Sequence, residues 1–409
     1  MKNTQAIHSD SAPETSLLAS IETVYPSIVA LTTRLATGSP LRIYHGIDPT
    51  RPELHLGHTV PLRILKRFQE ADHTAIVLIC DFTATVGDPS GRDNQRSVLK
   101  RNEVEANALA IKDQLFRVLD PVKTELHYNS EWYDDADRLG ATRKLLELTQ
   151  YFTAAQLWER DLFQVRQAKQ QPVSLMEFLY PVLQAYDSVA LNVDIEVGGS
   201  DQMFNMLAGR TLMKQLLKKE KFVITTPLIL GTDGRKMSKS YGNTIPVGAV
   251  ASEMFGQLMS LPDDQMVSYM THLTDRFHGL DEQTTYEALV RDDPREAKAV
   301  LAREVTLLYH GSEAATEAER LFDATFRHHV LPTDIEQIEL ERVNDGANLV
   351  QLLKAAASRS EAVRLIHQGG LTIDDNRITD ANSPVLYRQG RPIVVRIGKR
   401  RFFRVSILR

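Results

Sequence analysis

The segment LRIYHGIDPTRPELHLGHTV, residues 41–60, decides the fold class of this chain. Its first four residues, 41–44, are typical of a short strand, and HGIDPT (45–50) has the composition of a turn. A helix is expected to begin near His55, and the apolar run AIVLIC (75–80) that follows predicts a second strand. Strand, turn, helix and strand in this order indicate a parallel sheet flanked by helices, so we predict an α/β fold.

The sheet is expected to continue to about residue 230, which gives a first domain over residues 1–230. Residues 95–170 have apolar positions at helical spacing and predict a helical insertion within this domain. VDIEV (193–197) predicts a strand, GGSDQ (198–202) predicts a loop that opens a helix, and residues 222–230 predict the last strand.

After residue 230 the chain becomes rich in helix patterns, which predicts a helical domain over 231–335. Residues 331–344 carry few apolar side chains in register and are interpreted as a linker. The tail, residues 336–409, predicts two helices and then a hairpin that alternates apolar and polar residues on both sides of GKRR (398–401). We therefore expect three domains.

Length and composition fit a soluble globular protein. The chain has 409 residues, of which 43% are hydrophobic and 25% charged. Its one cysteine, Cys80, excludes an internal disulfide and a cysteine-based zinc site. The first ten residues lack the apolar core of a secretory signal, and the apolar run 75–80 is too short to cross a bilayer. We expect a cytoplasmic protein with no membrane segment and no dedicated metal site.

Charge is distributed unevenly along the chain. Residues 345–409 contain 12 Lys and Arg against 5 Asp and Glu, whereas the whole chain has a net charge of −5. A basic tail on an acidic body predicts a module that binds a polyanion. A solvated charged surface without a partner is the alternative.

His55 and His58 lie one turn apart at the expected helix start, with Gly57 between them. A helix N-terminus offers free N–H groups and a positive dipole end, and both suit phosphate. The imidazoles can add hydrogen bonds to a nucleotide that lies against the glycine backbone. Taken alone, such a pair is more often two surface histidines than a phosphate site.

A second motif, KMSKS (236–240), follows the last expected strand. Its lysines, Lys236 and Lys239, and its serines, including Ser240, lie in a loop bounded by glycines. Such a loop can close over a triphosphate and neutralise charge on a departing pyrophosphate. A basic surface loop is the alternative for this motif alone, but the two motifs together, each in its expected place, predict one nucleotide site.

These two motifs resemble the HIGH and KMSKS signatures of class I aminoacyl-tRNA synthetases. Three other segments are similar to the tyrosyl-tRNA synthetase family in particular: YHGIDPT (44–50), YPVLQAYD (180–187) and GGSDQ (198–202). The resemblance extends from about residue 40 to the C-terminus. It implies a Rossmann-like, nucleotide-binding parallel sheet as the catalytic domain, and a small α+β RNA-binding domain at the C-terminus that resembles a ribosomal-protein module.

The resemblance implies a tyrosine pocket. Tyr44 and Asp187 would bind the substrate's phenolic hydroxyl, which both donates and accepts a hydrogen bond. Phenylalanine would leave these groups buried and unpaired, a rule of specificity for which the tyrosyl enzyme is the standard example. Tyr180, Gln184 and Asp187 recur at i, i+4 and i+7 and so share one helix face. The residues implied to hold the ammonium and carboxylate of the amino acid are Asp88, Tyr180, Gln184, Thr83 and Gln202.

It also implies an ATP site, with ATP arriving together with Mg2+. The residues implied to bind the nucleotide and ribose are Asp48, Gly57, Gly199 and Asp201. Those implied to meet the phosphates or to clamp the pyrophosphate are Thr50, His55, His58, Lys236, Lys239 and Ser240. Because the substrate carboxylate is already a nucleophile, positioning and charge stabilisation would supply the rate.

The implied partners are L-tyrosine, ATP, tRNA(Tyr) and a second copy of the chain that docks through the insertion. Candidate RNA contacts in the tail are Arg359, Arg364, Lys399, Arg400 and Arg401. Two alternatives remain at this point: a tryptophanyl-tRNA synthetase, which has a similar fold, and a synthetase-like RNA-binding protein without catalysis. Tyr44 together with Asp187 argues against the first, and the presence of both signature motifs argues against the second.

Overall fold

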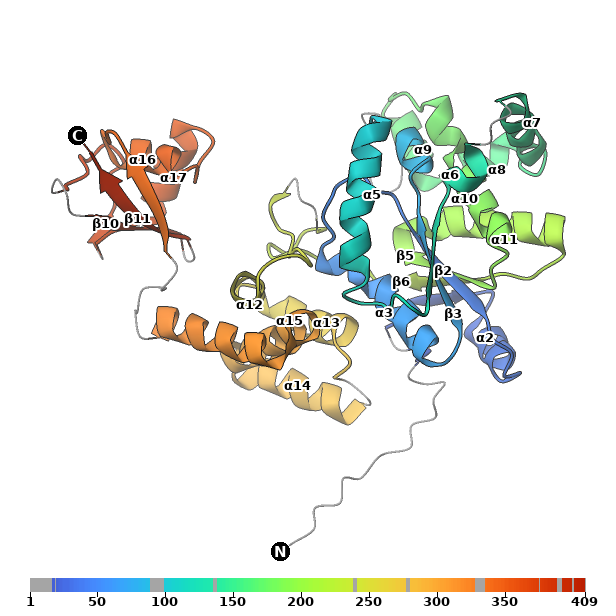
Figure 1. The fold of residues 1–409 in the computed structure, drawn as a ribbon, viewed down its shortest axis with the longest axis horizontal. Coiled ribbons are helices and arrows are strands. Elements are labelled where there is room, and N and C mark those ends of the chain that lie inside the picture. Colours follow the sequence, from blue (N-terminus) through green and yellow to red (C-terminus); the bar gives the residue numbers. More distant parts are fainter. Residues whose placement is uncertain are drawn as a thin grey trace, which may run out of the picture. The chain divides into compact units, whose positions relative to one another are not determined.

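The computed structural model forms two compact units, Met1–Ala315 and Thr316–Arg409, and each is described here by itself (Figure 1). The residues that the structure describes are 17–18, 20–88, 99–134, 138–237, 241–276, 280–327, 335–374, 376–387, 392–398 and 401–408.

A six-stranded sheet forms the centre of the first unit. Its strand order is β1-β6-β5-β2-β3-β4, and all neighbouring strands run parallel except β1, which pairs antiparallel with β6. The expected parallel-sheet fold is therefore confirmed, with one antiparallel strand at its edge. The strands are β1 Thr23–Tyr25, β2 Arg42–Ile47, β3 Thr74–Ile79, β4 Thr124–Tyr128, β5 Ile195–Gly199 and β6 Phe222–Thr226.

Two strands were not predicted from the sequence. β4 lies inside residues 95–170, so the insertion expected over that whole range is wrong in its first part: this stretch supplies a strand to the sheet. β4 is a half-buried edge strand with the polar residues Glu125 and His127 at alternate positions, and it lacks the apolar run that marks β3. β1 has only three residues and is partly exposed, so it left no readable pattern in the N-terminal arm.

Helices follow most of these strands. α3 packs against β2 and β3 and α11 packs against β5 and β6, and the helices between β4 and β5 include the insertion. Their bounds are α2 Ile28–Leu35, α3 Leu56–Glu70, α4 Thr83–Val86, α5 Arg101–Leu115, α6 Ser130–Tyr133, α7 Arg138–Thr149, α8 Ala154–Trp158, α9 Asp161–Ala168, α10 Leu175–Ala190 and α11 Met203–Leu217. Nowhere in the described ranges does a helix reach the length and apolarity that a bilayer crossing requires.

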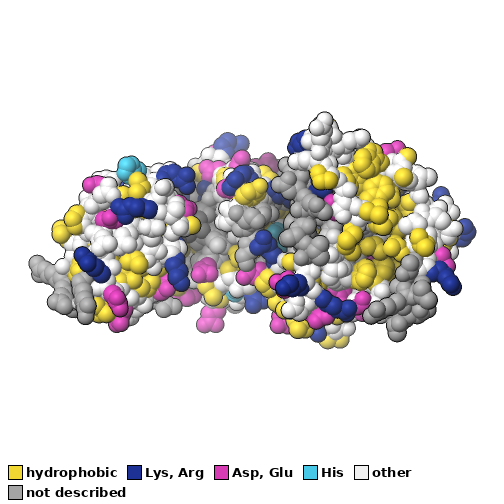
Figure 2. Space-filling model, turned by 90° about the horizontal axis from the view of Figure 1, so that it is seen from above, with side chains coloured by type: hydrophobic (Ala, Val, Ile, Leu, Met, Phe, Trp, Pro, Cys, Tyr) yellow, Lys and Arg dark blue, Asp and Glu magenta, His cyan; other side chains and the backbone are white. Residues whose placement is uncertain are grey.

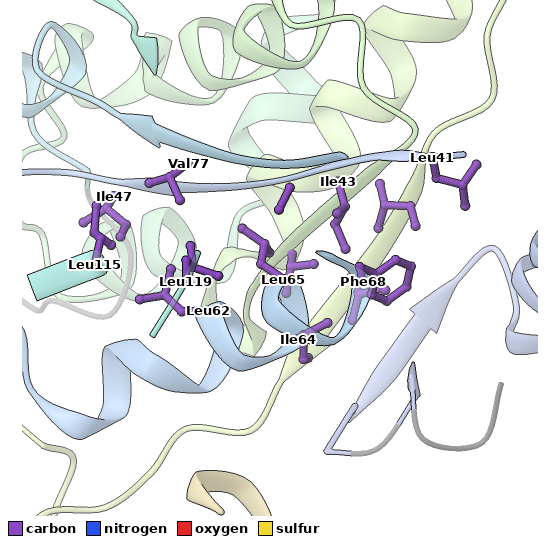
Figure 3. Close-up of a cluster of buried hydrophobic side chains, with 14 of the residues drawn as sticks. Leu41, Ile43, Ile47, Leu62, Ile64, Leu65, Phe68, Val77, Leu115 and Leu119 are labelled. Carbon is purple, nitrogen blue, oxygen red and sulfur yellow. The ribbon is translucent and has the colours of Figure 1, made fainter. Parts of the chain in front are cut away.

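Alternation along β2 gives its two faces different roles. Ile43 and Ile47 point into an apolar core with Leu65 and Phe68 of α3 and Val77 of β3 (Figure 3). Tyr44 points to the opposite face, towards α10. Each large apolar side chain buried in this core contributes about 1.5–3 kcal/mol. The core therefore fixes β2 rigidly and leaves Tyr44 on the face where its hydroxyl is free to serve a site.

The helices after β6 belong to the same compact unit as the sheet as far as Ala315. The separate helical domain expected over 231–335 is thus still a prediction. The last helix bends at Gly311, which has φ 81° and ψ 170° and interrupts the helical backbone. The helices are α12 Ala251–Leu258, α13 Met266–Leu273, α14 Leu280–Asp292 and α15 Pro294–Arg327.

The C-terminal unit contains a five-stranded sheet in the order β7-β11-β10-β8-β9. The expected hairpin is present as β10 and β11, with the alternate residues of both strands buried as predicted. The linker expected over 331–344 is wrong in part, because β7 pairs with β11 as an edge strand and its polar residues are exposed. The elements are β7 Glu336–Leu340, α16 Gly346–Leu352, α17 Arg359–His367, β8 Leu371–Ile373, β9 Asn376–Ile378, β10 Ile393–Ile397 and β11 Arg401–Ile407.

Candidate active site

A cavity of about 1220 Å³ opens at the carboxyl ends of β2 and β5. The strand order reverses between these two strands, and this is the position at which open α/β sheets bind ligands. Most of the residues predicted for the site line this one cavity: Tyr44, Asp48, Thr50, His55, Gly57, His58, Asp88, Tyr180, Gln184, Asp187, Gly199, Asp201, Gln202 and Lys236. Lys239 and Ser240 lie outside the described residues, and Thr83 is not part of the lining.

Tyr44 is buried at one end of the cavity, with 1% of its surface exposed. Its hydroxyl is 3.0 Å from Ser188 Oγ, on the opposing helix α10. Burial, reinforced by the negative charges of Glu196 and Asp187, raises the pKa of Tyr44 well above its ordinary value. The phenol therefore stays protonated at neutral pH and can donate a hydrogen bond.

Asp187, three residues after Gln184 on α10, is also buried and lines the same cavity. Its Oδ1 accepts a hydrogen bond from the indole N–H of Trp132 at 2.9 Å. Burial raises the pKa of Asp187 well above its ordinary value, and the hydrogen bonds from Trp132 and Asn129 counteract that rise. A buried carboxyl of this kind needs a polar ligand, such as a hydroxyl, to complete its hydrogen bonding.

Asp48, predicted at the edge of the nucleotide site, lines the cavity and contacts Tyr180 and Thr83. It accepts a hydrogen bond from the Tyr180 hydroxyl at 3.1 Å and another from Thr83 Oγ1 at 3.3 Å. Thr83 also accepts a hydrogen bond from Asn129 Nδ2 at 2.9 Å. Thr83 does not line the cavity, and its link to the site is its hydrogen bond to Asp48. Asp48 thus belongs with the residues predicted to hold the amino-acid ammonium.

Asp88 and Gln202 meet at the next part of the wall. Gln202 Nε2 donates to Asp88 Oδ2 at 2.7 Å, and Asn205 Nδ2 donates to Gln202 Oε1 at 3.0 Å. The other Asp88 oxygen is 3.4 Å from Nη2 of the buried Arg160. The two residues predicted to hold the ammonium and the carboxylate of one amino acid are therefore neighbours.

The histidine pair lies where α3 begins. Their rings stack with centroids 3.7 Å apart, and His58 Nδ1 accepts a hydrogen bond from the backbone N–H of His55 at 3.1 Å. Because Nδ1 of His58 is an acceptor, its proton is on Nε2. Burial lowers the pKa of His55 to about 4, and burial with the two neighbouring imidazoles lowers the pKa of His58 well below its ordinary value. Both rings are neutral at pH 7 and can donate hydrogen bonds to an anion only through N–H groups.

The second motif packs against the first. A Cβ atom added at Gly57 would lie 3.2 Å from the His55 ring and 3.6 Å from Met237 Sδ, so glycine permits this close approach. The backbone N–H of Leu56 also donates to the carbonyl of Ile245 at 3.0 Å. Lys236 Nζ lies 3.1 Å from Asp201 Oδ2 at the mouth of the cavity. The two predicted nucleotide motifs, nearly two hundred residues apart in sequence, thus meet at one site.

The predicted tail residues have different surroundings. Arg359 pairs with Asp345 at 2.9 Å and also donates to Asn382, while Arg401 donates to the carbonyl of Leu353 at 3.2 Å. Arg364 is exposed on α17. Lys399 and Arg400 lie outside the described residues.

Sequence reasoning missed several polar residues behind the cavity wall. One is Trp132, whose indole N–H donates a hydrogen bond to Asp187. Ser188, Glu196 and Lys221 are buried and connected to Tyr44. One signal could have found the charged pair: Glu196 lies between the apolar residues Ile195 and Val197 of one strand, and Lys221 immediately precedes the apolar start of another.

Comparisons with known proteins agree with this geometry. The sequence profile of tRNA synthetases class I (W and Y) matches residues 36–327. The tyrosine–tRNA ligase of Thermotoga maritima is 42% identical over 377 residues, which cover 91% of this chain and 92% of that protein. The tyrosine–tRNA ligase of Ralstonia nicotianae is 45% identical over 376 residues, which cover 91% and 93%.

Solved structures share the fold. A C-terminally truncated mitochondrial tyrosyl-tRNA synthetase from Coccidioides posadasii superposes with a TM-score of 0.61 at 24% identity, covering 76% of this chain and 91% of that one. Tyrosyl-tRNA synthetase from Archaeoglobus fulgidus, complexed with L-tyrosine, gives a TM-score of 0.59 at 23% identity, covering 75% and 98%. The expected class I architecture is confirmed, and with the sequence relatives it follows that this chain belongs to the tyrosyl-tRNA synthetases, the tyrosine–tRNA ligases of class I.

Proposed function

We propose that the cavity binds L-tyrosine and ATP, forms tyrosyl-adenylate and pyrophosphate, and then passes the tyrosyl group to the 3′ end of tRNA(Tyr). This proposal rests on the kinds of polar group that line the cavity. A buried phenol and a buried carboxyl, Tyr44 and Asp187, line one cavity with a helix N-terminus that carries two neutral histidines. A small phenol and a triphosphate are the ligands that such a cavity fits.

The phenol of tyrosine would lie between Tyr44 and Asp187. In this arrangement Tyr44 donates to the substrate oxygen, and the substrate hydroxyl donates to the Asp187 carboxylate. Phenylalanine would supply neither the acceptor for Tyr44 nor the donor for Asp187 in this buried site, and the loss of these two hydrogen bonds costs binding free energy. The indole of tryptophan would place no hydroxyl there, so the site favours tyrosine over both.

The amino-acid end of the substrate would lie near Asp88 and Gln202. Asp88, which is bound to Gln202, would supply negative charge for the ammonium group. Asp48, which accepts a hydrogen bond from Tyr180, would add to this charge. Gln184 lines the same wall and completes this binding set. Gln202 would direct the carboxylate towards the α-phosphorus of ATP.

ATP, as its magnesium complex, would bind with its phosphates at the start of α3. The Nε2–H of His58 and the N–H groups of the helix end face phosphate oxygens, and Thr50 lies beside them in the lining. Asp201 would bind the ribose. The position of Gly199 has no room for a side chain, since an added Cβ would lie 2.7 Å from Asp201 Oδ1. Lys236 would exchange its contact with Asp201 for the departing pyrophosphate.

The reaction needs no protein nucleophile. A carboxylate oxygen of tyrosine attacks the α-phosphorus, the bond from that phosphorus to the bridging oxygen breaks, and pyrophosphate leaves. The protein's contribution is to hold the reactants in line and to stabilise the charge on the leaving group. Lys239 and Ser240 are proposed to join Lys236 in this role.

We also propose a homodimer that forms through the insertion and binds tRNA with the help of the basic tail. Figure 2 shows apolar side chains gathered on one face of the unit that contains the six-stranded sheet. Several residues in the insertion or at the start of α10 are apolar and more than 40% exposed, as is typical of an interface: Leu146, Val165, Leu175 and Met176. All three substrates would meet the enzyme in the cytoplasm.

Amino-acid-dependent exchange between ATP and pyrophosphate tests the proposal. Exchange with tyrosine, and little exchange with tryptophan or phenylalanine, is the expected result. Exchange with tryptophan alone would overturn the assignment of tyrosine, and binding of tRNA without any exchange would overturn the assignment of activity.

A further inference from the structure

A chain of buried polar groups leads from the cavity into the protein behind Tyr44. Lys221 Nζ donates to Ser188 Oγ at 2.9 Å and also forms a short ion pair with Glu196 Oε2. Ser188 Oγ lies 3.0 Å from the Tyr44 hydroxyl and 3.2 Å from Glu196 Oε2. Tyr44 and Glu196 are cross-strand neighbours in β2 and β5, so the sheet register itself brings the group together.

This group is fully enclosed. Lys221 and Ser188 are 0% exposed, and Glu196 is 3% exposed. A buried ion pair gives little net stability, because the loss of hydration offsets most of the attraction. An apolar pair would satisfy the fold equally well, which points to a role for the charges beyond packing.

The neighbouring helix is shaped to accommodate the pair. A Cβ atom at Gly209, in the middle of α11, would lie 2.4 Å from Lys221 Nζ and 2.8 Å from Ser188 Oγ. Glycine in a helix interior costs about 1 kcal/mol relative to alanine. Glycine at position 209 therefore lowers the stability of α11 but leaves space for the side chain of Lys221.

The donors and the distances in this group favour one direction, although Ser188 can also donate to Glu196 Oε2 at 3.2 Å. Lysine has three N–H donors and no acceptor, so Ser188 Oγ must accept from Lys221 and has its own hydrogen left to donate. The two oxygens of Glu196 already accept from Lys221 and from Gln184 Nε2, the latter at 3.0 Å. The Tyr44 oxygen is the nearer acceptor for Ser188. Tyr44 then accepts from Ser188, and its own hydrogen is available to the cavity.

We propose that Lys221 and Ser188 are positioning residues that hold the Tyr44 hydroxyl as a hydrogen-bond donor towards the phenol oxygen of the substrate. This inference rests on the proposed function. Lys221 would begin a one-way series of hydrogen bonds through Ser188 and Tyr44 to the substrate, and Asp187 would receive the substrate's own hydrogen. Glu196 balances the charge of Lys221, so that the series starts from a neutral pair.

The test compares the ratio of kcat/KM for tyrosine to that for phenylalanine in ATP–pyrophosphate exchange. Ser188→Ala removes the donor to Tyr44 and should lower this ratio about tenfold, the effect of one hydrogen bond. In a Tyr44→Phe background the same substitution should change the ratio by less than about twofold, because the hydroxyl that Ser188 orients is already absent. Ser268→Ala on α13, away from the cavity lining, is the matched control and should leave the ratio unchanged.

A second variant addresses the lysine without leaving a lone buried charge. Lys221→Met combined with Glu196→Gln removes both charges and should lower the ratio to a similar extent. A ratio that stays constant or rises in Ser188→Ala would overturn the inference, since Ser188 would then be donating to Glu196. Equal losses for both amino acids would also overturn it and indicate a structural role. Absence of tyrosine-dependent exchange in the unaltered protein would instead reject the proposed function.

Discussion

The indole N–H of Trp132 donates a hydrogen bond to Asp187 Oδ1 over 2.9 Å. Trp132 belongs to the four-residue helix α6, directly after β4, whereas Asp187 is near the end of α10. A short element at the sheet edge thereby orients one of the two buried groups proposed to bind the substrate phenol. This contact also favours the carboxylate form of Asp187 against the effect of burial.

Replacement of this indole should weaken tyrosine binding. Trp132→Phe removes the N–H and keeps an aromatic ring, so KM for tyrosine should rise about tenfold with a smaller change in kcat. The measurement is tyrosine-dependent exchange with varied tyrosine. Trp158→Phe is the control, because the Trp158 N–H binds Gln167 near the surface. Equal effects of the two substitutions would contradict a specific role for Trp132.

Asp187→Asn should stabilise the free protein while it impairs tyrosine activation. The folded state raises the pKa of Asp187 above its ordinary 3.8, so between these two pKa values the folded state binds more protons than the unfolded state, and stability falls as pH rises. The asparagine variant lacks this fall. Urea unfolding should therefore show an advantage of about 1 kcal/mol for the variant at pH 7 that shrinks towards pH 4. An advantage independent of pH would argue against a buried titrating carboxyl.

His55 should make stability depend on pH in the acid range. Its pKa is lowered from 6.5 to about 4 by burial, so in this window the unfolded chain takes up a proton that the folded protein refuses. Stability is then lost as pH falls from 6.5 to 4, by at most about 3 kcal/mol for this residue. His55→Asn should remove that share of the slope in urea unfolding.

His272 provides the matched control for this experiment. Its pKa is also lowered to about 4 by burial, with help from Arg67, and it lies outside the cavity lining. His272→Asn should flatten the stability curve in the same way but keep the exchange activity, whereas His55→Asn should lose about a hundredfold in rate. Loss of activity in both variants would mean that folding, and not phosphate binding, explains the effect.

Lys236→Ala should reduce adenylate formation without harming the fold. Lys236 is half-exposed and forms an ion pair with Asp201 at 3.1 Å, a kind of pair that contributes about 0–1 kcal/mol. Exchange should fall about a hundredfold, mostly in kcat, while the urea midpoint is unchanged. Lys214→Ala, an exposed lysine on α11, is the control. Equal effects on binding and rate would contradict a role in clamping pyrophosphate.

The two described arginines of α17 should separate RNA binding from stability. Arg364 is exposed, and Arg364→Ala should weaken tRNA binding several-fold. The slope of the logarithm of the binding constant against the logarithm of the salt concentration should fall by about one. Arg359 is bound to Asp345, whose side chain caps the start of α16, so Arg359→Ala should lower the thermal stability of the C-terminal unit. Filter binding at several salt concentrations and calorimetry measure the two effects. A larger loss of tRNA affinity in Arg359→Ala would reverse the assignment.

Part of the site was readable from the sequence because its residues are local to short motifs. The helix spacing of Tyr180, Gln184 and Asp187 and the position of His55 and His58 at a helix start depend only on neighbouring residues, and the structure has both features. The half-buried strand β4 and the polar strand β7 were not readable, because an edge strand is defined by its partner and not by an apolar run.

The sequence by itself determined the α/β class and the two nucleotide motifs, since each depends on periodicity, on turn residues or on short spacings along the chain, whereas the pocket residues were implied by the resemblance to a family. Only the tertiary structure decided that Asp48 lies with Tyr180, that Trp132 binds Asp187, and that Lys221 and Glu196 form a buried pair behind Tyr44. These contacts join residues from 25 to more than 100 positions apart, and the register of neighbouring strands and the packing of α10 on the sheet bring them within hydrogen-bonding distance. No local pattern encodes such a distance, because it depends on how the whole core closes.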